Sequence, residues 1–589
     1  MGKYIVLTFF LLIMACPAGN SFFLEPTKKL IKFGWDTPNT EFLLEHLSEI
    51  EDNMESYDGL GINMNSSSQK IPSESGTYSH PAGSTAMWFH DWKWERSFFE
   101  KEIEHLKQAN AASRHLKHNF IMTNSGIYKA RFDWFDDGLW EVICHNFSLM
   151  AGIARETFCK GLQIDLEDYG RGAFQYHSAC GYSFAQAWDK ARQRGREFAR
   201  AITREFPDII LFTFFWTDLN FNIADGVSSP YAKAEKSIMG LSLPFMNGVY
   251  DVLPETARVI AGNESAGYRA TSLIDYHELV ATFHQKSKWL LDPENYDKYR
   301  RTTQLGISFY LDRYIVTDPK SIYFIGEDAE SNLALFKQNL CHTLCFSDEY
   351  AWTWGEKRSW YPWVFGGWMK KAADKIERPG PLWEDALPGL RRAMRYAKNP
   401  RQFYLQQIQQ EKLPENLLRN PGFEKAASSQ TDWLPGDCSL VQDGKPWGCW
   451  QTPDSNGSFT VVSDRGWNTS NAACMQGVKQ GCILQTFPFQ HKGAYFIRGK
   501  AKVSGTTAQA ELSIGWTDDK GRWNFWGHDQ HLAFARDLGD GWKEASCLLM
   551  MDACPPLAKG FSLKAGMKSA GTPSDVVWVD DLGIYHLKE

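Results

Sequence analysis

The chain has 589 residues, which is more than one hydrophobic core usually holds, so two or more domains are expected. Hydrophobic residues make up 43% and charged residues 23%, a balance that is typical of folded globular proteins and excludes a disordered chain. The formal net charge of −7 provides no broad attraction to phosphate backbones, which excludes nucleic acid as an expected partner.

The amino terminus predicts export. Lys3 precedes an apolar stretch at residues 4–15, which has the length of a signal-peptide core and is too short to cross a bilayer. We therefore expect a signal peptide at residues 1–20 and a mature protein that is secreted, periplasmic or held at the cell surface. Residues 12–16 (LIMAC) also have the outline of a bacterial lipobox, in which Cys16 would carry a lipid anchor; ordinary cleavage a few residues later is the alternative. No other segment has eighteen uninterrupted apolar residues, so no transmembrane span is expected.

Residues 30–356 predict an α/β barrel. Short apolar runs alternate with segments of helical periodicity, the pattern of repeated strand–helix units around a parallel sheet. Eight strands are predicted, the number in a (β/α)8 TIM barrel, and they begin near Leu30, Tyr57, Asn119, Gly161, Ile209, Arg258, Leu305 and Glu349. Helices with apolar residues three and four apart are predicted at residues 40–56, 136–159, 182–206, 274–290 and 328–345.

The segment at residues 243–253 fits either a strand or a helix. Phe245, Val249 and Val252 match one helical face, and Pro254 would stop the helix before the strand at Arg258. Further amphipathic helices are expected near residues 387–412. The barrel domain is therefore assigned to residues 25–412.

Residues 414–589 predict a β-sandwich. Turn residues recur about every ten positions between alternating runs, which is typical of antiparallel sheets. Residues 416–424 (NLLRNPGFE) and 577–582 (VWVDDL) resemble the opening and closing strands of the jelly-roll carbohydrate-binding modules of secreted glycoside hydrolases. The resemblance implies an all-β jelly roll that binds carbohydrate, with Glu424 and Asp581 holding a structural calcium ion. Carboxylate oxygens suit that hard cation.

Aromatic residues and cysteines add two expectations. The 24 Trp residues favour contact with sugars, because aromatic faces stack on sugar rings, although core packing uses the same residues. In the sandwich, the candidates for stacking, with core packing as the alternative, are Trp516, Trp523, Phe525 and Trp526. One or two disulfides are expected among the six cysteines of the last quarter, namely Cys438, Cys449, Cys474, Cys482, Cys547 and Cys554.

Acidic residues follow several predicted barrel strands. Residues 161–169 (GLQIDLEDY) form an apolar run that ends in Asp165, Glu167 and Asp168. Later strands are followed by Glu264, Asp312 and Glu356. The carboxyl ends of barrel strands form the chemical end of the fold, while helix capping and solvated loops are the alternative roles of such acids. The convergence of four strand ends predicts one site lined by carboxyl groups.

Asp165 and Glu167 are two residues apart, so in an extended segment they point to the same side. Repulsion between two close carboxylates raises one pKa and keeps that group protonated, which predicts Glu167 as the general acid, tuned by Asp165. The run GLQIDLE resembles the fourth-strand motif of family 18 chitinase-like hydrolases, in which an Asp-x-Glu pair ends the strand and its Glu is the acid. Lys160 and Gln163 depart from that motif, so the acetamido-assisted mechanism of that family is not inferred.

Glu264 is the predicted second carboxylate, acting as nucleophile or base. Asn263 and Glu264 resemble the Asn-Glu pair of the large retaining glycosidase clan, although there the pair closes the fourth strand and not the sixth. Glu356 is the alternative. The side chains expected to bind substrate are Trp354, Glu356, Trp35, Asp36 and Asp312, with Trp354 as the floor of the site.

Cleavage of a glycosidic bond requires two carboxyl groups, one to protonate the leaving oxygen and one to attack or to activate water. The sequence therefore predicts an exported glycoside hydrolase that acts on a poly- or oligosaccharide without a catalytic cofactor. A surface carbohydrate-binding protein without catalysis is the first alternative. A polysaccharide lyase is less favoured, because lyases use cationic or Tyr/His chemistry against a uronate and the predicted cleft is acidic.

Overall fold

The computed structural model describes the chain from residue 28 to residue 588 with several gaps. The described residues are 28–72, 79–83, 91–123, 132–167, 172–226, 229–361, 382–410, 413–424, 434–435, 447–467, 469–488, 490, 492–505, 507–523, 525, 527–551, 554–555, 557–569 and 572–588. The predicted signal peptide and Cys16 lie outside them. Within these ranges, none of the helices combines the length and apolar character that a membrane span requires.

The first compact unit ends at Lys398 and contains a parallel sheet with strands in sequence order. The strands are β1 (Lys29–Lys32), β2 (Gly59–Ile62), β5 (Phe120–Thr123), β6 (Gly161–Ile164), β7 (Ile210–Thr213), β8 (Arg258–Ala261), β9 (Thr303–Leu305), β10 (Ser308–Tyr310) and β11 (Tyr350–Trp354). A hairpin of β3 (Asn65–Pro72) and β4 (Ser79–Gly83) is inserted after β2.

The sheet closes into a barrel through β9 and β10. These two strands lie at opposite ends of the sheet order, yet only Gly306 and Ile307 separate them in the chain. The Gly306 amide donates to the Ala261 carbonyl of β8, and the Ile307 carbonyl accepts from the Trp352 amide of β11. One interrupted segment therefore bonds to both neighbours, and the structure confirms the predicted eight-position (β/α)8 barrel.

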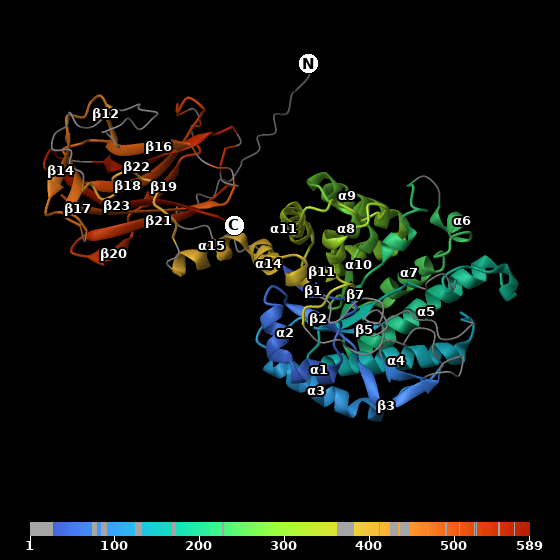
Figure 1. Cartoon of the computed structure of the whole chain (residues 1–589). Helices are drawn as coiled ribbons and strands as arrows, with labels where there is room; N and C mark the ends of the chain where they lie inside the picture. The colour runs from blue at the N-terminus through green and yellow to red at the C-terminus, as the bar shows by residue number, and fades with distance from the viewer. Residues whose placement is uncertain are drawn as a thin grey trace, which may run out of the picture. The chain divides into compact units, whose positions relative to one another are not determined.

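Helices follow the strands and lie outside them (Figure 1). They are α1 (Thr40–Glu45), α2 (Leu47–Asn53), α3 (Glu100–Ala112), α4 (Asp137–Glu156), α5 (Phe184–Glu205), α6 (Pro230–Ala234), α7 (Ser242–Val252), α8 (Glu264–Arg269), α9 (Leu273–Leu290), α10 (Pro293–Thr302), α11 (Ala329–Phe346), α13 (Trp383–Ala386) and α14 (Leu390–Lys398). The ambiguous segment at 243–253 is helical, as its apolar spacing favoured. The sequence analysis did not predict α3 and α10, whose surfaces are mostly charged.

Two apolar cores hold the barrel together. A large outer core fills the space between strands and helices, while a smaller, aromatic core fills the barrel interior. In the inner core the rings of Phe214 and Trp352 stack with centroids 4.3 Å apart, and Phe33 meets both Phe212 and Phe214 edge-on at 5.2 Å. The strands thus enclose packed side chains and leave chemistry to the loops above them.

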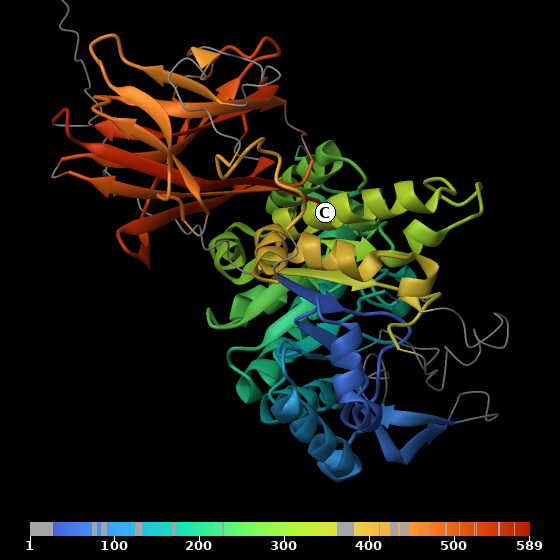
Figure 2. The same ribbon diagram turned by 60° about the vertical axis from the view of Figure 1, so that its left-hand side comes forward.

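The second unit, from Asn399, is a β-sandwich (Figure 2). One sheet has the order β12 (Leu434–Pro435), β13 (Gly448–Gln451), β16 (Gly481–Pro488), β22 (Gly560–Ser569), β18 (Gln509–Thr517) and β19 (Gln530–Ala533). The other has the order β14 (Ser458–Ser463), β15 (Asn471–Gln476), β23 (Val576–Leu587), β17 (Ala494–Ser504), β21 (Trp542–Met550) and β20 (Arg536–Gly539). The structure confirms the predicted all-β domain.

The division between the units falls at Lys398 and Asn399, ahead of the boundary near residue 414 expected from composition. Helix α15 (Pro400–Gln409) accounts for the difference, because it contacts β21 and the Gln407 side chain donates to the Lys588 carbonyl at 3.4 Å. The opening segment of the sandwich pairs with its closing strand, since the Leu417 amide donates to the Ile584 carbonyl at 2.9 Å.

Candidate active site

The site begins where β6 ends. The carboxyl group of Asp165 accepts a 2.9 Å hydrogen bond from the Glu167 amide, and Asp165 is only 7% exposed. Burial and the nearby Glu167 charge raise the pKa of Asp165 to about 7. Glu167 is half-buried. The predicted Asp-x-Glu pair is therefore electrostatically coupled, while Asp168 lies outside the described residues.

Asp218 is a site residue that the sequence analysis missed. It lies in a short 3-10 helix (Thr217–Asn220) after β7, and its carboxyl group accepts a 2.6 Å hydrogen bond from the Trp216 amide. Burial raises the pKa of Asp218 to about 6. The signal was present, because Asp218 follows the strand predicted from Ile209 as the other acids follow theirs, and β7 lies between β6 and β8.

Glu264 faces these carboxyl groups from the end of β8. Its position depends on Asn263, which has φ +45° and ψ +51°, a left-handed conformation that Asn tolerates better than most residues. The pKa of Glu264 is raised well above its ordinary range by partial burial and then by the charges of Asp165, Glu167 and Asp218. The structure thus brings Glu167 and Glu264 together, with two further carboxyl groups beside them.

Tyrosines of the next elements complete this side of the mouth. The ring of Tyr268, from α8, stacks on Tyr310 at the end of β10 with centroids 4.7 Å apart, and Tyr323 lies 4.8 Å from Tyr310. The charges of Glu264 and Glu356 act on Tyr268 and, together with its burial, raise the pKa of its phenol. Tyr268 therefore lies between the Glu264 side and the Glu356 side of the mouth.

Trp354 and Glu356 form the edge after β11. The indole N–H of Trp354 donates to the Glu356 carboxylate at 3.0 Å. Asp312 is 0% exposed and accepts hydrogen bonds from the amides of Glu356 at 2.7 Å and Lys357 at 3.0 Å. Burial raises the pKa of Asp312 to about 6. Asp312 thus positions the backbone of Glu356 from below, whereas the sequence analysis expected it to touch substrate.

The two predicted residues after β1 part ways. Trp35 is 40% exposed, whereas Asp36 is 1% exposed and forms an ion pair with Lys32, which is also buried. Asp36 further accepts hydrogen bonds from the Ser359 hydroxyl at 3.3 Å and the Trp360 amide at 3.1 Å. The structure gives Asp36 a position beneath the surface, where it ties the segment after β11 to β1, in place of the expected contact with substrate.

The Lys32–Asp36 pair predicts a measurable loss of stability. Lys32→Met leaves a buried carboxylate without its cation, so we expect the free energy of unfolding to fall by about 3–5 kcal/mol. Denaturant unfolding of the full chain, followed by the helical circular-dichroism signal, measures it. The double variant Lys32→Met/Asp36→Leu removes both charges and should recover part of the loss. An unchanged midpoint for Lys32→Met would contradict this account.

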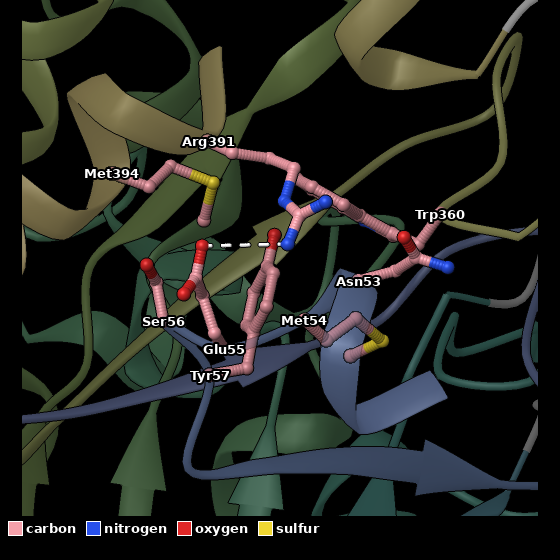
Figure 3. Close-up of a pocket in the computed structure, with 8 residues that line it drawn as sticks. All are labelled: Asn53, Met54, Glu55, Ser56, Tyr57, Trp360, Arg391 and Met394. Atoms are coloured by element: carbon pink, nitrogen blue, oxygen red, sulfur yellow. Dashed lines mark hydrogen bonds and ion pairs between the residues drawn. The ribbon is translucent and has the colours of Figure 1, made fainter. Parts of the chain in front are cut away.

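A small pocket lies elsewhere in the first unit, between the end of α2, the start of β2 and α14 (Figure 3). Its empty volume is about 160 Å³, and Glu55 and Arg391 form a 3.4 Å ion pair beside it. Residues 53–57, which line it, precede β2 and so lie at the amino end of that strand. None of the carboxyl groups described above lines it.

In the sandwich, the predicted calcium pair does not fit a shared cation site. Asp581 pairs with Lys500 at 2.6 Å and lies 3.5 Å from Arg498, while Glu424 accepts hydrogen bonds from the amides of Ser470 and Asn471. Within the described ranges, no cluster of three or more His, Cys, Asp or Glu residues is arranged to hold a metal ion. The acid that points inward is Asp580, which is buried and binds the Trp467 amide and the Thr469 hydroxyl.

The other expectations for the sandwich have mixed outcomes. Trp516 is buried in the core, and Phe525 packs against it. The indole of Trp523 donates to the Ser562 hydroxyl and lies 4.6 Å from the Lys564 ammonium group; Trp526 lies outside the described residues. Four of the six cysteines from which one or two disulfides were expected are free thiols, namely Cys474, Cys482, Cys547 and Cys554. Cys438 lies outside the described residues.

Comparison with known proteins identifies no family. No protein-family model matches the sequence, and no curated protein is similar to it. Among solved structures, the enzymatically active domain of tailspike protein 4 of bacteriophage CBA120 is similar at 16% identity, over 29% of this chain and 21% of that chain, with a TM-score of 0.21.

Two carbohydrate-binding modules are also similar. TmCBM61, solved in complex with β-1,4-galactotriose, shares 12% identity over 29% of this chain and 99% of its own, with a TM-score of 0.20. The CBM22-2 xylan-binding domain of Paenibacillus barcinonensis Xyn10C shares 17% identity over 28% of this chain and 97% of its own, with a TM-score of 0.21. The C-terminal domain thus resembles carbohydrate-binding modules in fold.

Proposed function

We propose that the barrel is a glycoside hydrolase that cleaves O-glycosidic bonds by paired-carboxylate catalysis. The observation that carries the proposal is the coupling of Glu264 to Asp165 and Glu167 at the carboxyl ends of β6 and β8. Acid-catalysed glycoside cleavage needs one carboxyl group that holds a proton and another that does not. A cluster of mutually repelling, partly buried carboxyl groups supplies both states near neutral pH.

The electrostatics favour a different division of roles from the one that the motif alone predicts. Glu264 is the group whose neutral form is most favoured, because three carboxyl groups act on it, so we assign it as proton donor. Glu167 then serves as nucleophile or base. The protonated form of Asp165 limits the negative charge between them.

Further parts of the proposal concern context. The signal-peptide pattern at residues 1–20 supports export, with Cys16 as the candidate lipid anchor. The exposed ring of Trp35 and the half-buried ring of Trp354 provide apolar faces for a sugar. We propose a poly- or oligosaccharide as the substrate.

A screen of the purified full chain on plant, algal and host glycans tests the function through the release of reducing ends. The Glu167→Gln variant should lose turnover on any substrate found and keep its affinity for it. A wild-type chain that binds a glycan and cleaves none would favour the non-catalytic binding protein. Release of unsaturated products that absorb ultraviolet light would identify a lyase.

A further inference from the structure

The mouth of the barrel carries more negative charge than the proposed reaction needs. Hydrolysis uses two carboxyl groups, whereas Asp165, Glu167, Asp218 and Glu264 act on one another and Glu356 acts on Tyr268 across the mouth. Burying surplus carboxyl groups costs free energy, as the raised pKa values of Asp165 and Asp218 show. A partner that offsets this cost would carry positive charge.

A second feature points into the same space. Tyr268 is 7% exposed, and within the described residues its hydroxyl group has no hydrogen-bond partner of normal geometry. It lies near the Glu264 carboxyl group, whose pKa it lowers slightly against the other influences. A buried hydroxyl group without a partner costs about 1–3 kcal/mol, so it is expected to be satisfied by a ligand or by water.

The protein's own cations do not neutralise the cluster. The strongest charge effects on Asp165 and Glu264 come from other carboxyl groups. Arg313 donates to the backbone carbonyl of Tyr268 at 2.6 Å, and Arg269 and Arg313 act on Tyr323. These guanidinium groups therefore serve the far side of the tyrosines.

The spacing of the carboxyl groups favours an organic cation over a metal ion. They influence one another electrostatically, yet in the part of the chain that the structure describes no three acidic, His or Cys side chains form a metal-binding group. An ammonium group on a ring is larger than a metal ion, bonds through separate N–H groups and is also attracted to aromatic faces such as those of Tyr268 and Trp354.

We propose that the substrate of this site is a saccharide that carries a protonated amino group, bound with that group beside Glu264, Asp218 and the Tyr268 hydroxyl. This inference rests on the proposed hydrolase function for the word substrate only. The ammonium group donates to the carboxylates and to the Tyr268 oxygen, while a uronate in the same position would be repelled.

Binding of such a cation should release protons. A positive charge beside Asp165, Asp218 and Glu264 stabilises their ionised forms, so protons held near pH 6 by burial and mutual repulsion are lost on binding. The groups that face them are Glu167, Tyr268 and, across the mouth, Glu356 and Tyr310. Calorimetry of glucosamine binding at pH 6 in two buffers of different ionisation enthalpy measures this release.

The test of specificity uses four sugars that differ in one substituent: glucosamine, N-acetylglucosamine, glucose and glucuronic acid. Titrations of the full chain at pH 6 should show glucosamine binding about tenfold more tightly than glucose, and glucuronic acid most weakly. Asp218→Asn should reduce the preference severalfold. Asp208→Asn, at an exposed position just before β7, removes the same charge away from the mouth and should leave it unchanged.

The outcomes separate this inference from the proposed function. Equal or tighter binding of glucose or N-acetylglucosamine, or the absence of a signal from glucosamine, overturns the inference even if the chain hydrolyses neutral glycans. A glucosamine preference that depends on Asp218, in a chain that cleaves no glycan, supports the cationic site and overturns the hydrolase. Proton release with glucosamine and none with glucose supports the ion pairing.

Discussion

Replacing Glu264 by Gln is expected to lower kcat on an ordinary glycoside by about 10²–10⁴-fold, the contribution of a positioned proton donor. The effect follows from the raised pKa of Glu264, which keeps its proton available at the pH where Glu167 is assigned to act as a carboxylate. Gln has nearly the same shape and cannot donate that proton to the leaving oxygen. Steady-state kinetics on the substrate found in the glycan screen measure the loss.

The choice of leaving group distinguishes the two glutamates. An aryl glycoside with an acidic phenol leaves without protonation, so Glu264→Gln should retain most of the rate of bond cleavage on it. Glu167→Gln should lose activity on both substrates. Glu255→Gln, an exposed residue before β8 that pairs with Arg301, is the matched control. If Glu264→Gln loses the aryl glycoside and Glu167→Gln keeps it, the two roles are reversed.

Asp165→Asn should stabilise the protein at alkaline pH. The pKa of Asp165 is raised from 3.8 to about 7 in the folded state, so its favourable contribution is complete below pH 3.8 and is lost as pH rises through 7. Above that pH the native state buries a charge that Asn does not carry. The shift corresponds to a gain of up to about 4 kcal/mol for the variant at pH 8 relative to pH 3.

Denaturant unfolding of the wild type and of Asp165→Asn at several pH values measures this difference. Asn can still accept the hydrogen bond from the Glu167 amide, so local geometry should be kept. Asp208→Asn, at an exposed position, should show no such pH dependence. A difference between Asp165→Asn and the wild type that is the same at low and high pH would show that the carboxyl group ionises normally.

The barrel strands could be predicted because each is buried on both faces and is therefore an apolar run with a clear end. The exception was the seventh strand, which Gly306 and Ile307 interrupt so that its two halves bond to different neighbours. Helices with long apolar stripes were also found, whereas α3 and α10, with mostly charged sequences, were not. Amphipathic signals are weak where few residues face the core.

The site was predicted less evenly. Proximity of Glu167 and Glu264 followed from topology alone, because the ends of parallel strands meet at one face. Asp218 obeyed the same rule and was missed because no motif marked it. The structure shows a buried position for Asp36 and Asp312, each bound to backbone amides of the segment after β11. An acid after a strand looks the same in sequence whether it faces solvent or caps a loop.

The sequence by itself determined the barrel, the sandwich and the strand ends that carry carboxyl groups, because these depend on local periodicity and on the order of strands. Only the tertiary structure decided which carboxyl groups share a space, which are buried and which already have a partner. Ion pairing, desolvation and mutual repulsion act between residues far apart in the chain. Thus Lys32 neutralises Asp36, Lys500 pairs with Asp581, and Glu264 keeps its proton because Asp165, Glu167 and Asp218 lie beside it.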